Sequence, residues 1–338
     1  MSNPHTTFIV GAGASAEYDF PVGSKLLSDI RKLVDFDHDI YSQSNLTQDQ
    51  KQFVSAINSL HVKFDTLKEI KDQIIYADSI DRYISRFNDD AKKQDVCKIA
   101  ICLKLFKSEH NCYSDDRGLL KDEFWVSESS RGWLFKFFKY LTRRISTSDL
   151  DSVFENISII CFNYDRCIEF FLWNMLQRAY GITAERASEL ILKLNIVHPY
   201  GSLGTLPFQA GRRIAFGIEY PNLNNVYKEI KTFSEAVEDN EINYIISKSM
   251  WDAGTIVFLG FSFGQENIKL ISQANSSIVQ GSYSKKVYAT AFGVHAPNVE
   301  AFKARINSLF PASMNIYVEV SPLTCSDFFD HYTEAISR

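Results

Sequence analysis

Hydrophobic positions along the chain follow two patterns. Short runs of apolar, β-branched or aromatic residues predict buried strands. These runs lie at residues 7–10, 157–162, 194–198, 255–259, 286–291 and 315–320. Between the later runs, apolar residues recur at helical spacing in segments 165–180, 183–193, 242–252, 266–274 and 297–310. Strands and helices therefore alternate from about residue 155 onward, which is typical of a parallel sheet covered by helices on both faces.

The region 36–150 contains only helical patterns, and Thr47 with Gln50 forms a capping box ahead of the first of them. These patterns span residues 48–60, 64–76, 79–87, 93–108 and 127–145. We therefore predict an α/β protein with a Rossmann-like, doubly wound parallel sheet and a large helical insertion after the first strand unit. Residues 1–35 and 151–338 would form the sheet domain, and residues 36–150 the insertion.

The first strand ends in a glycine-rich turn. Its residues are Gly11, Ala12, Gly13, Ala14 and Ser15. Such a turn binds dinucleotide phosphates, because glycine adopts unusual dihedral angles and lets the phosphate approach the backbone. The dehydrogenase form of the motif adds a third glycine and an acidic residue at the end of a second strand. Here Ala16 follows the turn, and Asp35 follows a predicted helix at 24–34. Hydride transfer is therefore disfavoured.

Other predicted strands also end in polar or glycine-rich segments, where ligands bind in doubly wound sheets. Asn163 and Asp165 follow the second strand, either as helix caps or as ligand contacts. His198 ends the third, either as a buried core imidazole or as a general base. After the fourth strand comes a turn that suits phosphate or ribose, although a tight turn alone also explains its glycine. It contains Gly260, Phe261 and Ser262.

Composition narrows the classes of function. With a net charge of −5 over 338 residues, the chain has no overall field that would attract nucleic acid. An aromatic stripe at 133–140, followed by Arg143 and Arg144, is more typical of a core or an oligomer interface than of base stacking. No apolar stretch reaches the roughly 18 residues of a membrane span, and the N-terminus does not resemble a signal peptide. We therefore expect a cytoplasmic protein without membrane contact.

The cysteines suggest neither a disulfide framework nor a metal site. Six are present, and none forms a Cys-x-x-Cys pair. Cys97, Cys102, His110 and Cys112 lie close together in the sequence, but their spacing matches no common zinc pattern. We expect reduced, buried thiols and no bound metal.

Taken in order, the four strand ends resemble the sirtuin superfamily, and more closely the sirtuin-like NAD hydrolases of prokaryotic anti-phage defence. The resemblance is carried by residues 11–15 and 20–23, 162–165, His198 and 259–262. Ser79-Ile80-Asp81 in the insertion resembles a further recurrent feature of the defence branch. The four-cysteine zinc ribbon of the protein deacylases is missing, and Pro199 and Tyr200 stand between the histidine and Gly201, where the family usually has glycine directly after it.

This resemblance implies an NAD+ hydrolase that cleaves the nicotinamide–ribose bond and depletes NAD in abortive infection. The first glycine turn would hold the NAD phosphates, and residues 260–262 would contact phosphate or the adenosine ribose. Asn163 and Asp165 would hold the nicotinamide side and its ribose, and His198 would be the catalytic base. The resemblance also implies a homo-oligomer and a separate sensor chain such as a HerA-type ATPase.

Two other classes of function stay open. The protein could be a non-enzymatic module that binds NAD or ADP-ribose, which would show nucleotide binding without turnover. It could instead be an NAD-dependent deacylase or ADP-ribosyltransferase, which would consume NAD only when an acylated peptide or an acceptor is supplied.

Overall fold

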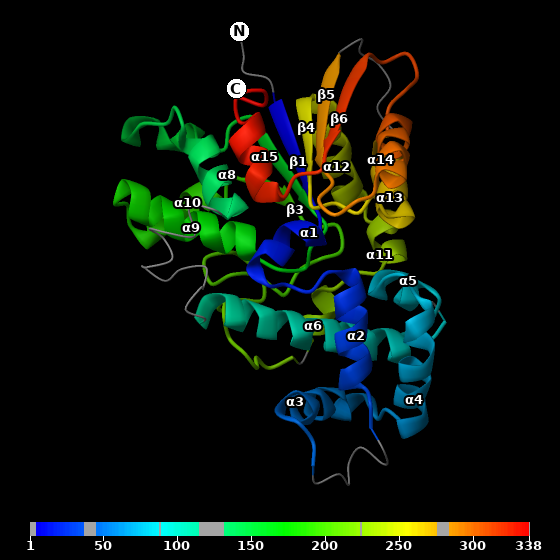
Figure 1. Cartoon of the computed structure of the whole chain (residues 1–338). Coiled ribbons are helices and arrows are strands. Elements are labelled where there is room, and N and C mark those ends of the chain that lie inside the picture. The colour runs from blue at the N-terminus through cyan, green and yellow to red at the C-terminus, as the bar shows by residue number, and fades with distance from the viewer. Residues whose placement is uncertain are drawn as a thin grey trace.

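Six parallel strands form one sheet at the centre of the molecule (Figure 1). The computed structural model describes residues 5–36, 45–87, 89–114, 132–223, 225–275 and 284–337. The strand order is β3-β2-β1-β4-β5-β6. The strands are β1 (His5–Val10), β2 (Ile157–Cys161), β3 (Asn195–Val197), β4 (Ala253–Leu259), β5 (Lys285–Thr290) and β6 (Ile316–Ser321). This arrangement confirms the predicted Rossmann-like α/β fold.

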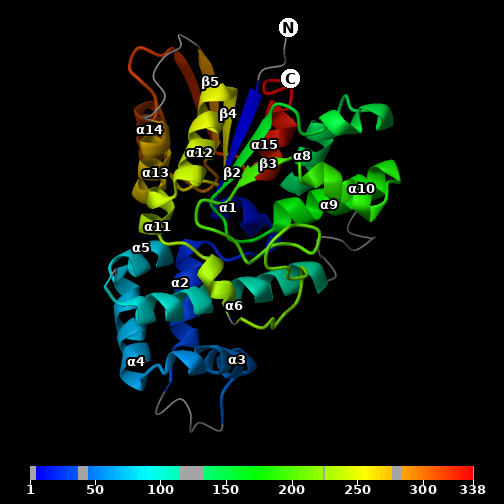
Figure 2. The same cartoon turned by 180° about the vertical axis from the view of Figure 1, so that it is seen from behind.

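Helices cover both faces of the sheet, as alternate side chains of β1 illustrate. The Thr7 hydroxyl donates to the Ser249 carbonyl of α12 (Asn240–Asp252) at 2.7 Å. The next side chain, Phe8, packs on the opposite face, with its ring 5.0 Å from Phe137 of α8 (Trp133–Thr142) and 6.3 Å from Phe329 of α15 (Cys325–Tyr332). Figures 1 and 2 show α12 on one face and α8 with α15 on the other.

The helices that alternate with the later strands begin and end close to their predicted positions. They are α9 (Cys167–Tyr180), α10 (Ala184–Ile191), α12, α13 (Gln265–Asn275) and α14 (Ala296–Ser308), and the shorter α11 (Phe233–Glu238) precedes α12. Gly181, in the left-handed conformation with φ of 63°, directly follows α9 and ends it. The short helix α11 and the final helix α15 were not among the predicted elements.

A second group of helices lies across the carboxyl ends of the strands, and we call α2 to α6 the helical layer (Figure 1, blue to cyan). After the single turn α1 (Ala12–Ser15), these helices are α2 (Gly23–Leu33), α3 (Gln48–Ile57), α4 (Phe64–Gln73), α5 (Ile80–Ser85) and α6 (Ala91–Ser114). The predicted capping box at Thr47 and Gln50 is formed at the start of α3. The layer thus lies directly beside the strand ends where a ligand would bind.

The last α-helix before β2, α8, packs on the sheet and not on the helical layer. Trp133, Phe137 and Tyr140 of α8 are buried, so the aromatic stripe belongs to the core. Conversely, α2, from the predicted sheet domain, packs against α3 to α6. Helices from both sides of the predicted boundaries share one core, and the division into two domains stays a prediction.

All six cysteines are buried and free of disulfides. None of the described helices combines the length and apolarity that crossing a membrane requires.

Candidate functional site

The candidate site lies at the point where the order of the strands in the sheet reverses. The chain proceeds from β1 to β2 and β3 on one side, and then returns to β4 on the other side of β1. In open α/β sheets, ligands bind at the carboxyl ends of the strands beside such a switch point. The loops after β1 and β4 leave the sheet here from neighbouring strands. The loops after β2 and β3 contribute the candidate polar residues.

The two glycine-rich loops pack against each other. The Gly13 amide donates to the Gly260 carbonyl at 2.9 Å. A Cβ at Gly11 would lie 2.7 Å from that carbonyl oxygen, and a Cβ at Gly13 would lie 2.8 Å from it. Gly260 has φ of 57°, and a Cβ there would lie 2.0 Å from the Ala14 nitrogen. This contact between the loops is sufficient by itself to require glycine at all three positions.

The remaining predicted cofactor-binding residues divide by exposure. Ala12 and Ser262 reach the surface, whereas Ala14 and Phe261 are buried. The Ala14 carbonyl accepts from the Trp133 indole at 2.8 Å. Only the exposed members of the two loops can therefore meet a ligand with their side chains in this arrangement.

A buried hydrogen-bonded network joins the end of β2 to the first glycine loop. The Asn163 side-chain nitrogen donates to the Gly11 carbonyl at 3.1 Å and to the Ser15 hydroxyl at 2.8 Å. The Ser15 hydroxyl donates in turn to Asp165 Oδ2 at 2.7 Å. Asn163, Asp165 and Ser15 are each less than a tenth exposed. The structure thus brings these three predicted site residues together.

This network fixes the orientation of the Asn163 side chain. A carbonyl only accepts hydrogen bonds, so the amide nitrogen of Asn163 must face Gly11 and its Oδ1 must face the other way. Among the described residues, none donates a hydrogen bond to that Oδ1. Asn163 therefore presents an acceptor that a water molecule or a hydroxyl group can use.

Asp165 combines the two roles that its position in the sequence left open. Its Oδ1 accepts from the Cys167 amide at 3.2 Å, at the start of α9, while its Oδ2 accepts from Ser15. Burial raises the pKa of Asp165, and the hydrogen bonds from Ser15 and Cys167 oppose that shift. The carboxyl group therefore serves as a helix cap and also orients the Ser15 hydroxyl.

His198 follows β3 directly and is hydrogen-bonded through both ring nitrogens. Nδ1 lies 2.7 Å from the Asn163 carbonyl, and Nε2 lies 3.1 Å from Glu169 Oε1 on α9. Burial alone would lower the pKa of His198, but the facing Cys161 thiol and Glu169 carboxylate raise it well above its usual value. Burial also raises the pKa of the Cys161 thiol, so Glu169 is the group that carries the negative charge.

Glu169 was not predicted as a site residue. Its side chain is 5% exposed, and its Oε2 has no hydrogen-bond partner among the described residues. Burial by itself raises the pKa of Glu169, yet His198 brings it below the usual value. The signal in the sequence was a single acidic residue within the apolar stretch 167–172.

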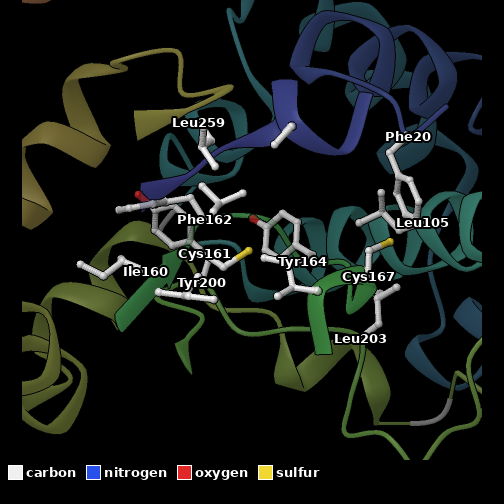
Figure 3. Close-up of a cluster of buried hydrophobic side chains, with 14 of the residues drawn as sticks. Phe20, Leu105, Ile160, Cys161, Phe162, Tyr164, Cys167, Tyr200, Leu203 and Leu259 are labelled. Carbon is white, nitrogen blue, oxygen red and sulfur yellow. The ribbon is translucent and has the colours of Figure 1, made fainter. Parts of the chain in front are cut away.

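The loop from Asn163 to Arg166 contacts two different layers with alternate side chains. Asn163 and Asp165 contact the glycine loop, as described above. Tyr164 donates its hydroxyl hydrogen to Asp81 of α5, and Arg166 binds Glu109 of α6 through two nitrogens. Figure 3 shows Tyr164 beside Cys161 and Phe162 of the buried apolar cluster at these strand ends. Asp81, from the segment 79–81 that carries part of the resemblance, thus lies at the site. Glu109 also contacts this loop, and it was not predicted as a site residue.

Asp35 lies outside this network. It follows α2 and forms an ion pair with Lys71 in the helical layer. This position confirms the prediction that Asp35 stands at the end of a helix and not at the end of a strand. The geometry of a dehydrogenase ribose site is therefore absent at Asp35.

A separate cavity of about 380 Å³ lies within the helical layer, away from the strand ends. Lys104 and Lys107 line it and bind the Asp49 carboxylate at 2.9 and 2.8 Å. Because the Asp49 carboxylate forms ion pairs with both lysines, their charges are already compensated within the protein.

Comparison with protein-family models, with curated proteins and with solved structures gives no match. The function of the chain is therefore inferred from the site itself and from the order of its motifs.

Proposed function

We propose that the protein is an NAD+ hydrolase that cleaves the nicotinamide–ribose bond and releases nicotinamide and ADP-ribose. The observation that supports this proposal best is the network of Asn163, Ser15 and Asp165 at the switch point of the sheet. It holds an acceptor oxygen in one orientation beside two glycine-rich loops. The order of the strand-end motifs, which resembles that of the sirtuin-like NAD hydrolases, supports the same proposal.

The chemistry of the bond explains why such a network suits the reaction. Nicotinamide leaves from a positively charged form, so the transition state resembles an oxocarbenium ion. Under this proposal, Asn163 Oδ1 accepts a hydrogen bond from the attacking water or from a ribose hydroxyl. The Asp165 carboxylate supplies negative charge near the ribose through the Ser15 hydroxyl.

The glycine loops would contribute binding energy away from the reacting bond. Ala12 and Ser262 are exposed on the two loops that flank the switch point. NAD phosphates or the adenosine ribose bound there would hold the nicotinamide ribose against Asn163. Binding energy from such remote groups accelerates a reaction when it fixes the reacting part of the substrate in position.

We further propose that the enzyme depletes NAD during anti-phage defence and that its activity depends on assembly. An uncontrolled NAD hydrolase would exhaust the NAD of the cell that makes it. A homo-oligomer, or a partner chain such as a HerA-type ATPase, would supply this control. The release of nicotinamide from NAD is therefore measured with and without the product of the neighbouring gene.

The test measures free nicotinamide released from NAD by the purified protein. Asn163→Ala should lower the rate by at least about 100-fold, because the oriented acceptor is lost. Asn307→Ala, at an exposed position on α14, is the matched control and should keep the parental rate. Equal rates for the parent and Asn163→Ala would contradict the proposal.

A non-enzymatic NAD or ADP-ribose binding module is the second candidate. It is favoured by one observation, namely that both nitrogens of His198 are already hydrogen-bonded within the protein. Calorimetric binding of NAD without nicotinamide release, with and without the partner chain, would support this candidate. NAD consumption only after addition of an acylated peptide or an ADP-ribose acceptor would instead indicate a transferase.

A further inference from the structure

The two atoms that face the His198 ring both accept hydrogen bonds. The Asn163 carbonyl has no proton to donate, so Nδ1 must carry one. The Glu169 carboxylate lies against Nε2, and an ionised carboxylate also only accepts. Both nitrogens are then protonated, and the ring is an imidazolium. A general base must instead have an unprotonated nitrogen that reaches the substrate or its water.

We propose that His198 is a positioning residue, a constantly protonated imidazolium that holds Asn163 in place, and that Glu169 is its counter-ion. This inference rests on the proposed hydrolase function and concerns the same site. His198 Nδ1 donates to the backbone carbonyl of Asn163, 2.7 Å away. The side chain of the same residue presents the free acceptor. The proton of the reaction would then pass to water and not to His198.

The surroundings of the ring support a fixed positive charge. Its titratable neighbours come from β2, from the loop after β2 and from α9, and they are Cys161, Asp165 and Glu169. None of these three is a cation, and the nearby Arg166 guanidinium acts on the Glu169 carboxylate, whose pKa it helps to lower. The side chains of His198 and Glu169 are 11% and 5% exposed, so water screens the pair only weakly. Burial of an uncompensated carboxylate is costly, so the imidazolium and Glu169 stabilise each other's charged forms.

A matched pair of substitutions separates positioning from base catalysis. In His198→Asn, the side-chain amide nitrogen lies near the place of Nδ1 and can donate to the Asn163 carbonyl. In His198→Gln, the amide lies near the place of Nε2, beside Glu169, and the donor to Asn163 is lost. Neither substitution provides a base. We expect nicotinamide release by His198→Asn to stay within about tenfold of the parent, and His198→Gln to fall by at least about 100-fold.

An activity-independent measurement uses the imidazole nitrogens of the ¹⁵N-labelled protein. The chain has seven histidines, and the His198 signals are those that disappear in His198→Asn. At about pH 8, where an unperturbed histidine is neutral, His198 should show two protonated nitrogens in the parent. Glu169→Gln should move the midpoint of this titration down by at least about one pH unit. Thermal unfolding of each variant verifies that the fold is kept.

The two measurements distinguish the inference from the function on which it rests. A neutral His198 ring at about pH 8 in the parent would overturn the inference whatever the activity. Equal loss of nicotinamide release in His198→Asn and His198→Gln would restore the base role and also overturn it. If the parent releases no nicotinamide under any condition, the hydrolase proposal fails, and the nitrogen spectrum alone decides whether His198 is an imidazolium.

Discussion

Two buried ion pairs flank the loop from Asn163 to Arg166, and they differ in how completely their polar atoms are hydrogen-bonded. Arg166 and Glu109 are almost completely buried, with side chains 1% and 0% exposed, and the Arg166 guanidinium also donates to the Ile214 carbonyl. His198 and Glu169 meet through one contact of 3.1 Å. Every side-chain nitrogen and oxygen of the first pair has a hydrogen-bond partner, and we call it the saturated pair. In the second pair, Glu169 Oε2 has none among the described residues.

The two pairs also differ in whether the cation can lose its proton. An arginine stays charged throughout the pH range in which proteins are folded, whereas an imidazolium can lose its proton. The Arg166 guanidinium also lies 5.6 Å from the Phe106 ring centre and 5.9 Å from that of Phe216. We conclude that Arg166 and Glu109 fix the loop to the helical layer, and that the charge of His198, unlike that of Arg166, depends on its carboxylate partner.

The largest effect should follow from breaking the saturated pair. Glu109→Ala leaves Arg166 buried without its carboxylate, and the free energy of unfolding should fall by about 3–5 kcal/mol. Denaturation by urea measures this loss. Glu300→Ala, which breaks an exposed pair with Lys303, should change the same quantity by less than about 1 kcal/mol. Similar small losses in both variants would contradict the structural role of Glu109.

The contact between the two glycine-rich loops allows the stability lost by overpacking to be compared with the stability lost by breaking an ion pair. Gly260→Ala places a methyl group 2.0 Å from the Ala14 nitrogen at a positive φ. We expect a loss of about 1–3 kcal/mol from overpacking, added to about 1–2 kcal/mol for the left-handed backbone. Gly293→Ala is the matched control, because its φ is 72° and nothing lies within 4 Å of the added carbon. Equal melting temperatures for the two variants would show that the loops do not pack tightly.

Removing the charge of Glu169 should have a smaller effect that depends on pH. At about pH 6, Glu169→Gln should be less stable than the parent by about 1.5–3 kcal/mol, the typical contribution of a charged hydrogen bond. The pKa of His198 is raised above 6.5, so its contribution is complete below pH 6.5 and is lost as the pH rises through the folded value. The pKa of Glu169 is lowered below 4.5, so its contribution is complete above pH 4.5 and is lost as the pH falls through the folded value.

The difference in stability between the parent and Glu169→Gln should therefore be greatest between about pH 4.5 and 6.5 and should shrink on either side. Urea denaturation at a series of pH values measures it. A difference that stays constant from about pH 6 to 9 would mean that Glu169 does not raise the pKa of His198 in the folded protein, and it would contradict the ion pair.

The smallest effect should come from Asp49, whose partners line the cavity of the helical layer. Burial alone raises the pKa of Asp49, but Lys107, Lys104 and Tyr220 lower it to about 2. Its stabilising contribution is therefore present above the usual pKa of 3.8 and is lost as the pH falls toward 2. Asp49→Asn should lower the free energy of unfolding by about 1–2 kcal/mol at neutral pH, and by less at high salt. A loss as large as that of Glu109→Ala would remove the distinction between the fully buried pair and the part-buried pairs of Asp49.

The sequence predicted the parts of the molecule that depend on local patterns. The apolar run before Gly11 and the runs before Asn163 and His198 became neighbouring strands. Strand-end residues of a parallel sheet meet at one edge, so their proximity followed from the fold class. The core position of the aromatic stripe in α8 also followed from its helical spacing.

The partners of these residues could not be predicted in the same way. Glu109 lies 57 positions before Arg166, and no periodicity relates α6 to the start of α9. Glu169 contacts His198 across 29 positions, through the packing of α9 beside β3. The reason for glycine at positions 11 and 13 was also incomplete, since the neighbouring Gly260 loop, 247 positions beyond Gly13, accounts for it. Tertiary contacts of this kind depend on how the elements pack, so the sequence does not identify the partner even where an acidic residue stands alone in an apolar stretch, as Glu169 does.

We propose that Asn163 orients the attacking water or the ribose during NAD hydrolysis. Asn163→Asp tests it most directly, because the side chain keeps its size but loses the amide hydrogens that bind Gly11 and Ser15. We predict that this variant, folded and assembled like the parent, releases nicotinamide from NAD at least about 100-fold more slowly. Release at the parental rate would contradict the claim.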